Sequence, residues 1–184
     1  AGPLRIRGLH ARGDFFVPLA TTEGALVASY HRGCEAIGAA DGCTAAVLSE
    51  GLQRAPAFRF ESLVHAGSFA IWASEAFESL VEQAATTTRH GVLRQVRPVV
   101  EGNQVWLILE YTTGDAAGQN LVTLATDAVC RWIETASPVP ILKWYIEGNM
   151  SGDKKACGQT FGGVRGRKVC AEATLPRKVV GDIL

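Results

Sequence analysis

The sequence lacks the features that mark several large classes of protein. No apolar run approaches the roughly 20 residues that span a bilayer as a helix, so we expect no membrane segment. Lysine plus arginine and aspartate plus glutamate number 18 each, and this balance gives no indication of nucleic-acid binding. The first residues do not have the pattern of a signal peptide. These absences predict a soluble, cytoplasmic protein.

Cysteines are few and scattered. There are five of them, an odd number, and no two form a Cys-x-x-Cys pair. Neither a disulfide framework nor a zinc site is expected from this spacing. We therefore predict free thiols and no metal site.

What the chain has is enough apolar residues for a core. Its 184 residues are 47% hydrophobic and 20% charged, which suits one domain, or a small domain inserted in part of a larger one. Helical spacing and two-residue alternation predict the order βαββαβ in the middle of the chain. The predicted strands cover 56–60, 92–100, 104–111 and 141–146, and the predicted helices cover 62–83 and 116–135.

This order predicts an α+β fold with a ferredoxin-like βαββαβ domain over residues 54–147. The flanks, 1–53 and 148–184, are each too small for a domain and would together form part of a larger α/β domain. Within them we expect a helix over 22–38 and a strand over 168–173.

Glu23 is the first candidate for chemistry. It is a lone carboxylate in the small, apolar stretch from Pro18 to Ser29. Burial would raise its proton affinity into a range useful for acid–base catalysis. Alternatively, Glu23 is a first-turn acid that the helix dipole favours.

The second candidate is the segment Thr113-Gly114-Asp115-Ala116-Ala117-Gly118-Gln119-Asn120, between a predicted strand and a predicted helix. Asp115 is expected to cap the helix, and the small residues after it leave room for a phosphate or ribose to approach free amides. The alternative is an ordinary capped helix with small packing residues.

The third candidate is Gly148-Asn149-Met150-Ser151-Gly152-Asp153-Lys154-Lys155. Two lysines beside an aspartate could hold an anionic substrate and place an ammonium group near a developing oxyanion. A solvated charged loop is the alternative.

Three motifs, ATTEGALVAS with the following RGC, TGDAAGQN and GNMSGDKK, stand in an order that resembles the hydroxymethylglutaryl-CoA reductase family. The opening AGPL and the later RGRKVCAEATLPRKVV are also similar to that family. The resemblance implies a small ferredoxin-like domain that binds a nicotinamide cofactor, inserted in a larger domain that binds acyl-CoA. It also implies a homodimer with the active site at the interface.

The implied reaction is the reduction of an acyl thioester to an alcohol through a hemithioacetal, with NADPH or NADH as hydride donor and coenzyme A as part of the substrate. By resemblance, Lys154 would stabilise the oxyanion and Glu23 would supply a proton. The acyl portion would be oriented by Arg89, Asn149, Asp153 and Lys155, and the CoA moiety by Ser29 and Arg32. The dinucleotide would be contacted by Asp115, Ala116, Gly118, Gln119 and Asn120.

The family's catalytic aspartate, in a GQD-type motif, and its C-terminal histidine have no counterpart in the sequence. They would come from a longer chain or from a partner. Two alternatives stay open. One is a shortened non-redox homologue that performs a cyclisation or condensation on a thioester of CoA or an acyl-carrier protein, with Lys154, Glu23 and Cys157 as reactive groups. The other is a binding module without turnover.

Overall fold

In the computed structural model the chain forms two compact units, Ala1–Leu48 with Val169–Leu184, and Ser49–Lys168. The structure describes residues 1–153, 158–162 and 165–184. Two strands, β3 (Thr44–Arg54) and β8 (Arg165–Glu172), pair with each other and each contain a boundary between the units. Helices and antiparallel strands occur together, so the predicted α+β class is confirmed.

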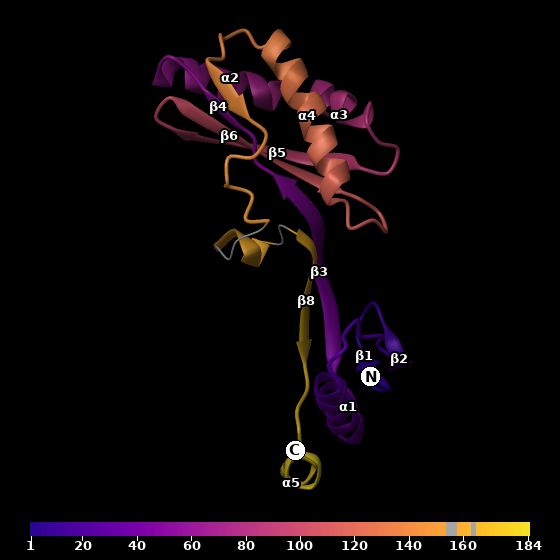
Figure 1. Ribbon diagram of the computed structural model, residues 1–184. Helices are drawn as coiled ribbons and strands as arrows, with labels where there is room; N and C mark the ends of the chain where they lie inside the picture. The colour runs from indigo at the N-terminus through magenta and orange to yellow at the C-terminus, as the bar shows by residue number, and fades with distance from the viewer. Residues whose placement is uncertain (154–157, 163–164) are drawn as a thin grey trace. The chain divides into compact units, whose positions relative to one another are not determined.

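The second unit contains the predicted βαββαβ order of elements (Figure 1). Its strands β7, β4, β6 and β5 are neighbours in that order, and every pair is antiparallel. The end of β3, Leu52–Arg54, also pairs with β6, next to the part of β6 that pairs with β4. The elements are β4 (Ala57–Arg59), α2 (Leu63–Glu75), α3 (Phe77–Ala85), β5 (Val92–Glu101), β6 (Gln104–Thr112), α4 (Gln119–Ala136), β7 (Lys143–Tyr145) and the short 3-10 helix η1 (Gly158–Gly162).

One hydrophobic core lies between this sheet and its helices. Along β6, Val105, Leu107 and Leu109 alternate with residues of the other face and are fully buried. Phe69 of α2 and Val129 of α4 belong to the same cluster, so both helices cover the same face of the sheet. Truncating one large side chain of such a core typically costs about 2–5 kcal/mol.

Two expected helices differ from the structure. The predicted helix over 62–83 is two helices, because Ala76 leaves helical geometry with φ −79° and ψ 12°. The helix expected from 116 begins at Gln119. Asp115 is therefore not its cap, and this prediction was wrong. Gly118 precedes the helix instead, with φ +76°, a conformation that glycine adopts without the steric cost of a Cβ atom.

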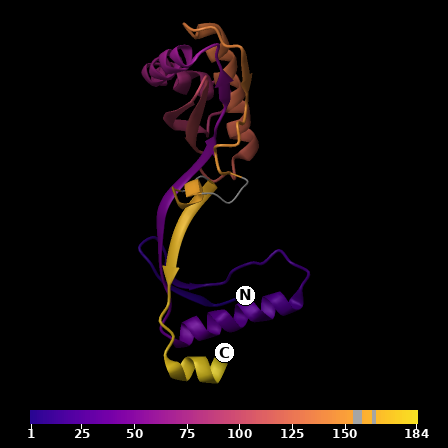
Figure 2. The same cartoon turned by 90° about the vertical axis from the view of Figure 1, so that its left-hand side faces the viewer.

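The first unit is built around helix α1 (Gly24–Ala39), close to the predicted 22–38. Strands β1 (Leu4–Arg7) and β2 (Arg12–Phe15) form an antiparallel hairpin, and a parallel bridge joins Ile6 to Cys43. Helix α5 (Arg177–Ile183) lies beside α1 (Figure 2). The strand β3 was not predicted, since its small residues carry no strong alternation.

The four cysteines in the described part of the chain are free, as expected. No helix of that part is long and apolar enough to cross a membrane.

Candidate functional site

Arg54, the last residue of β3, joins three segments of the second unit through its guanidinium group. Nη1 donates to Oδ2 of Asp153 over 2.8 Å, and Nε donates to Oγ1 of Thr123 over 3.1 Å. Nη2 donates to the carbonyl oxygen of Gln119 over 3.1 Å, and Nη1 also donates to that of Gln53 over 2.8 Å. Arg54 is only 6% exposed. A single buried cation thus connects β3, the first turn of α4 and the loop after β7.

Asp153, predicted to bind substrate, is the buried partner of this arginine. It is 6% exposed, and a second arginine, Arg165, has its Nε 3.9 Å from Oδ1. Among the described residues, Oδ1 has no hydrogen-bond partner. Buried polar atoms are nearly always paired in native proteins. In the described part of the chain this oxygen therefore has an ion pair with Arg165 and no hydrogen bond.

Hydrogen bonds also fix the start of the same loop. Glu147 accepts from the backbone N–H of Ala55 at 3.2 Å and from that of Asn149 at 2.9 Å. The indole N–H of Trp106 donates to the carbonyl oxygen of Gly148 over 3.0 Å, and a Cβ at Gly148 would meet that indole at 2.3 Å. Asn149 is exposed and has φ +62°. The loop that precedes the lysines is therefore held against β3 and β6.

A cavity of about 540 Å³ lies in the first unit, and another of about 370 Å³ lies at the start of α4 in the second. The smaller one is lined by Glu50, Gly51, Leu52, Thr113, Gly114, Asp115, Ala116, Ala117, Gly166 and Arg167. Five of these residues, Gly51, Gly114, Ala116, Ala117 and Gly166, have no side chain or only a methyl group, so backbone forms much of the wall.

The segment that lines the smaller cavity makes a tight turn. Thr113 donates from Oγ1 to the carbonyl oxygen of Ala116 over 2.7 Å. Gly114 and Gly118 have positive φ values, and a Cβ at Gly118 would lie 2.4 Å from Cγ2 of Thr113. Helix α4 has no side-chain cap at its start. Its first amides are therefore left for another acceptor, and such helix starts favour anions.

Arg167 brings a positive charge to the same cavity. Its Nε donates to Oε2 of Glu50 over 3.1 Å. This bond and the charge of Glu50, with a smaller contribution from Asp115, raise the pKa of Arg167. Arg167 is well exposed, so the pair is worth little to stability, and its cation can reach a ligand.

Three predicted residues lie in the first unit. Glu23 stands at the N-terminal boundary of α1 without a side-chain capping bond and is exposed. Ser29 lines a largely apolar cavity of about 440 Å³ between α1 and the hairpin. Arg32, two turns along α1, is exposed. The roles given to these residues stay predictions.

The other predicted residues are in or beside the second unit. Arg89 is exposed between α3 and β5 and makes no hydrogen bond or ion pair within the described residues. Lys154 and Lys155, together with Cys157, lie outside the described residues. Asp115 and Ala116 line the cavity before α4, while Gly118, Gln119 and Asn120 form the start of the helix.

Arg54 was missed by sequence reasoning. No local motif marks it, since it stands between Gly51-Leu52-Gln53 and the start of the predicted strand at Pro56. Its partners lie 65, 69 and 99 residues further along the chain. The only available signal was an isolated charge beside a predicted buried strand.

Comparison with known proteins agrees with this description. Residues 1–184 match the family model described as hydroxymethylglutaryl-coenzyme A reductase. The 3-hydroxy-3-methylglutaryl-coenzyme A reductase of Aeropyrum pernix is 45% identical over 186 residues, which cover 100% of this chain and 44% of the relative. That of Haloferax volcanii is 42% identical over 184 residues, covering 100% of this chain and 45% of the relative. The chain thus spans less than half the length of these relatives.

Solved structures show the same fold. A 3-hydroxy-3-methylglutaryl-coenzyme A reductase of Streptococcus pneumoniae matches with a TM-score of 0.69 and 16% identity, over 97% of this chain and 45% of that one. A class II enzyme from the same organism, bound to NADPH in open conformations, matches with a TM-score of 0.66 and 16% identity, over 98% of this chain and 46% of that one.

The fold and site define an α+β protein in which a glycine-walled cavity at a helix start is tied by a buried arginine to an aspartate-bearing loop. Together with the match over its whole length, this shows the family. The chain belongs to the hydroxymethylglutaryl-coenzyme A reductase family.

Proposed function

We propose that this chain is the cofactor-binding part, and a portion of the acyl-CoA-binding part, of an enzyme that reduces hydroxymethylglutaryl-CoA with NADPH. The observation that carries the proposal is the bonding of Arg54 to both Gln119 and Asp153. It joins the start of the proposed dinucleotide-binding helix to the loop that leads to Asp153 in one hydrogen-bonded assembly. Catalysis needs a rigid site, since reacting groups must be held within a fraction of an ångström of their productive positions.

The cavity before α4 fits a dinucleotide. Its glycines allow close approach of a pyrophosphate to the backbone, and the uncapped amides of α4 favour the negative charge. In this proposal Asp115 and Ala116 line the part of the cavity that holds the ribose and the phosphates. Gly118, Gln119 and Asn120 form the start of the helix, which lies next to the phosphates. When bound, the nicotinamide supplies the hydride that reduces the carbonyl carbon. NADPH is the preferred donor because the related Streptococcus pneumoniae enzyme has been solved with it.

The acyl portion of the substrate would lie against the loop after β7. Oδ1 of Asp153, which has no hydrogen-bond partner among the described residues, accepts a hydrogen bond from a substrate hydroxyl, while Arg54 orients the carboxylate through Oδ2. Asn149, Lys155 and Arg89 orient the rest of the acyl group in this proposal.

Two residues are proposed to act on the reacting carbonyl. The ammonium group of Lys154 stabilises the oxyanion that forms when the carbonyl carbon is reduced. A fixed charge of this kind in a dry site is worth roughly 3–4 kcal/mol of barrier, by analogy with a single oxyanion-hole donor. Glu23 supplies the proton that the oxyanion requires, and Ser29 and Arg32 hold the CoA moiety. The remaining catalytic groups come from the rest of a longer chain or from the second subunit of a cytoplasmic homodimer.

The experiment is a fluorescence titration of the purified chain with NADPH, followed by addition of hydroxymethylglutaryl-CoA. We expect saturable binding of NADPH. Oxidation of NADPH on adding the thioester would establish the reductase reaction. Binding of NADPH without its oxidation would support a cofactor-binding part that needs the catalytic aspartate and histidine from elsewhere. The same result would support a non-redox homologue only if another acyl-thioester reaction is detected. No binding of NADPH would contradict the proposal.

A further inference from the structure

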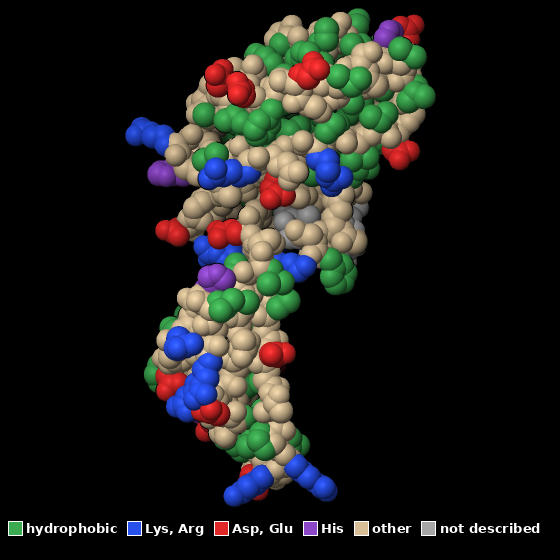
Figure 3. Space-filling model, turned by 180° about the vertical axis from the view of Figure 1, so that it is seen from behind, with side chains coloured by type: hydrophobic (Ala, Val, Ile, Leu, Met, Phe, Trp, Pro, Cys, Tyr) green, Lys and Arg blue, Asp and Glu red, His purple; other side chains and the backbone are tan. Residues whose placement is uncertain are grey.

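The hairpin of β1 and β2 carries an unusual arrangement of charges in the first unit. Arg5 pairs with Asp14 in the strand register, and Arg7 pairs with Arg12. Because alternate residues of a strand point to the same side, these four side chains share one face of the hairpin. Basic and acidic side chains gather over this hairpin on the molecular surface (Figure 3).

Two of the three arginines already have carboxylate partners. Arg5 binds Asp14 in a bidentate manner, with Nε 2.9 Å from Oδ1 and Nη2 3.1 Å from Oδ2. This hydrogen-bonded pair lowers the pKa of the Asp14 carboxyl. Arg7 forms an ion pair with Asp41, in the turn after α1. The acids of the hairpin and of the neighbouring turn are therefore engaged.

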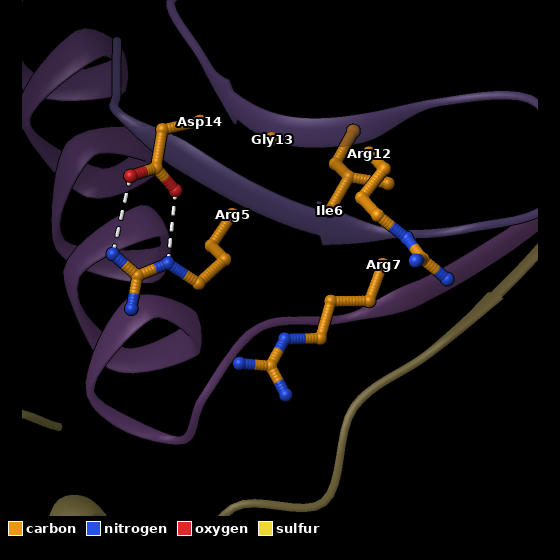
Figure 4. A pocket seen from close by; sticks show the side chains of 6 residues that line it. All are labelled: Arg5, Ile6, Arg7, Arg12, Gly13 and Asp14. Atoms are coloured by element: carbon orange, nitrogen blue, oxygen red, sulfur yellow. Dashed lines mark hydrogen bonds and ion pairs between the residues drawn. The ribbon is translucent and has the colours of Figure 1, made fainter.

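Arg12 has no such partner. It makes no hydrogen bond or ion pair within residues 1–153, 158–162 and 165–184, although it stands directly opposite Arg7. Like charges directly opposite each other in a strand pair destabilise it. Figure 4 shows the side chains of Arg7 and Arg12 leaving neighbouring strands, while Arg5 turns to Asp14. The hairpin thus keeps one unneutralised cation beside a second one.

These side chains surround a cavity of about 540 Å³, lined by Arg5, Ile6, Arg7, Arg12, Gly13 and Asp14. Gly13 has no side chain to fill it and lies with φ +139° next to Arg12. A volume of this size takes a phosphate ester with part of its organic group. The planar donor fork of arginine matches phosphate oxygens in a bidentate geometry.

We propose that this face of the hairpin binds a phosphoryl group, held by Arg12 and Arg7. A dianion placed between the two guanidinium groups would replace their repulsion by two charge-assisted interactions. The group could belong to the 3′-phosphate of coenzyme A or be free phosphate. The proposal does not require the reductase reaction, because it concerns residues outside the cofactor cavity.

The test is isothermal titration calorimetry of the 184-residue chain at low ionic strength. Coenzyme A, dephospho-coenzyme A and inorganic phosphate are the probes. Arg12→Gln removes the unpaired charge, Arg12→Lys keeps a charge without the fork, and Arg131→Gln is the matched control. Arg131 is an exposed arginine of the second unit whose ion-pair partner among the described residues is Asp127, on its own helix. A hydrogen bond to a charged group is worth about 1.5–3 kcal/mol, so Arg12→Gln should weaken binding about tenfold or more.

Each outcome decides the proposal. Tighter binding of coenzyme A than of dephospho-coenzyme A, lost in Arg12→Gln and kept in Arg131→Gln, supports it and identifies the 3′-phosphate. If Arg12→Gln weakens the binding of inorganic phosphate as much as that of coenzyme A, the proposal is also supported, with free phosphate as the source of the phosphoryl group. The proposal is overturned if the affinities do not change in Arg12→Gln. It is also overturned if the substitution changes only the self-association of the chain, as measured by sedimentation. Since Arg12 is exposed and repelled by Arg7, the Tm of Arg12→Gln should equal or exceed that of the wild type, which excludes unfolding as the cause of lost binding.

Discussion

Replacing Arg54 by methionine should strongly destabilise the second unit. The substitution keeps a long apolar side chain but removes the cation from beside Asp153, whose side chain is only 3% exposed. Arg165 then stays as a distant partner, with Nε 3.9 Å from Oδ1. Removing one partner of a buried ion pair typically costs about 3–5 kcal/mol. Against a total stability of about 5–15 kcal/mol for a domain, this loss is large.

The cause can be separated from simple loss of packing. The double variant Arg54→Met/Asp153→Leu has no buried unpaired carboxylate, and replacement of a whole buried ion pair by apolar residues is often neutral. We expect it to recover about 2 kcal/mol or more relative to Arg54→Met, with the remaining deficit due to the bonds lost at Gln119 and Thr123.

Urea unfolding followed by tryptophan fluorescence measures these differences. The chain has four tryptophans, and all of them belong to the second unit: Trp72, Trp106, Trp132 and Trp144. The signal therefore reports that unit alone. A cost below about 1 kcal/mol for Arg54→Met, or a double variant as unstable as the single one, would refute the reasoning.

Three further predictions follow from the same structure. Lys154→Ala should abolish thioester reduction in any form of the enzyme that shows it and leave the urea midpoint unchanged; retained activity would mean that its proposed role is wrong. Tyr111→Phe should cost about 1–3 kcal/mol, because its buried hydroxyl bonds Thr126 over 3.0 Å, and the double change with Thr126→Val should restore part of this loss in urea unfolding. Burial raises the pKa of the Cys130 thiol, so Ellman's reagent should modify exposed Cys170 in the native protein and leave Cys130 unmodified until urea is added.

The sequence predicts those parts of the fold that rest on local pattern. The strands β5 and β6 alternate apolar and polar residues on either side of a Gly-containing turn, and the structure pairs them from Val92 to Glu101 with one irregularity between Leu93 and Gln95. Helical spacing of apolar residues also finds Phe69 of α2 and Leu80 of α3, which lie in the core. In α4 the face predicted from Leu121 and Leu124 is wrong, because Leu124 is 63% exposed and the buried face is formed by Val122, Ala125, Val129 and Ile133. Local pattern was sufficient in the two strands and in α2 and α3 because packing and propensity favour the same structure.

Local rules fail where backbone geometry or distant contacts decide. Asp115 has the residue type of a helix cap, but the helix begins three residues later than predicted, after Gly118 in a left-handed conformation. Arg54 shows the second kind of failure, since its bonds to Thr123 and Asp153 cross 69 and 99 residues of chain. Neither effect is visible in a window of neighbouring residues.

The most direct test of the central claim is the affinity of a matched pair of glycine variants for NADPH. Gly118 and Gly102 both have positive φ, but a Cβ at Gly118 would press on Thr113 at the cavity, whereas one at Gly102 would meet nothing within 4 Å. Gly118→Ala should raise the Kd of NADPH about tenfold or more, and Gly102→Ala should leave it at the wild-type value. Equal affinities in the two variants would contradict a dinucleotide site at the start of α4.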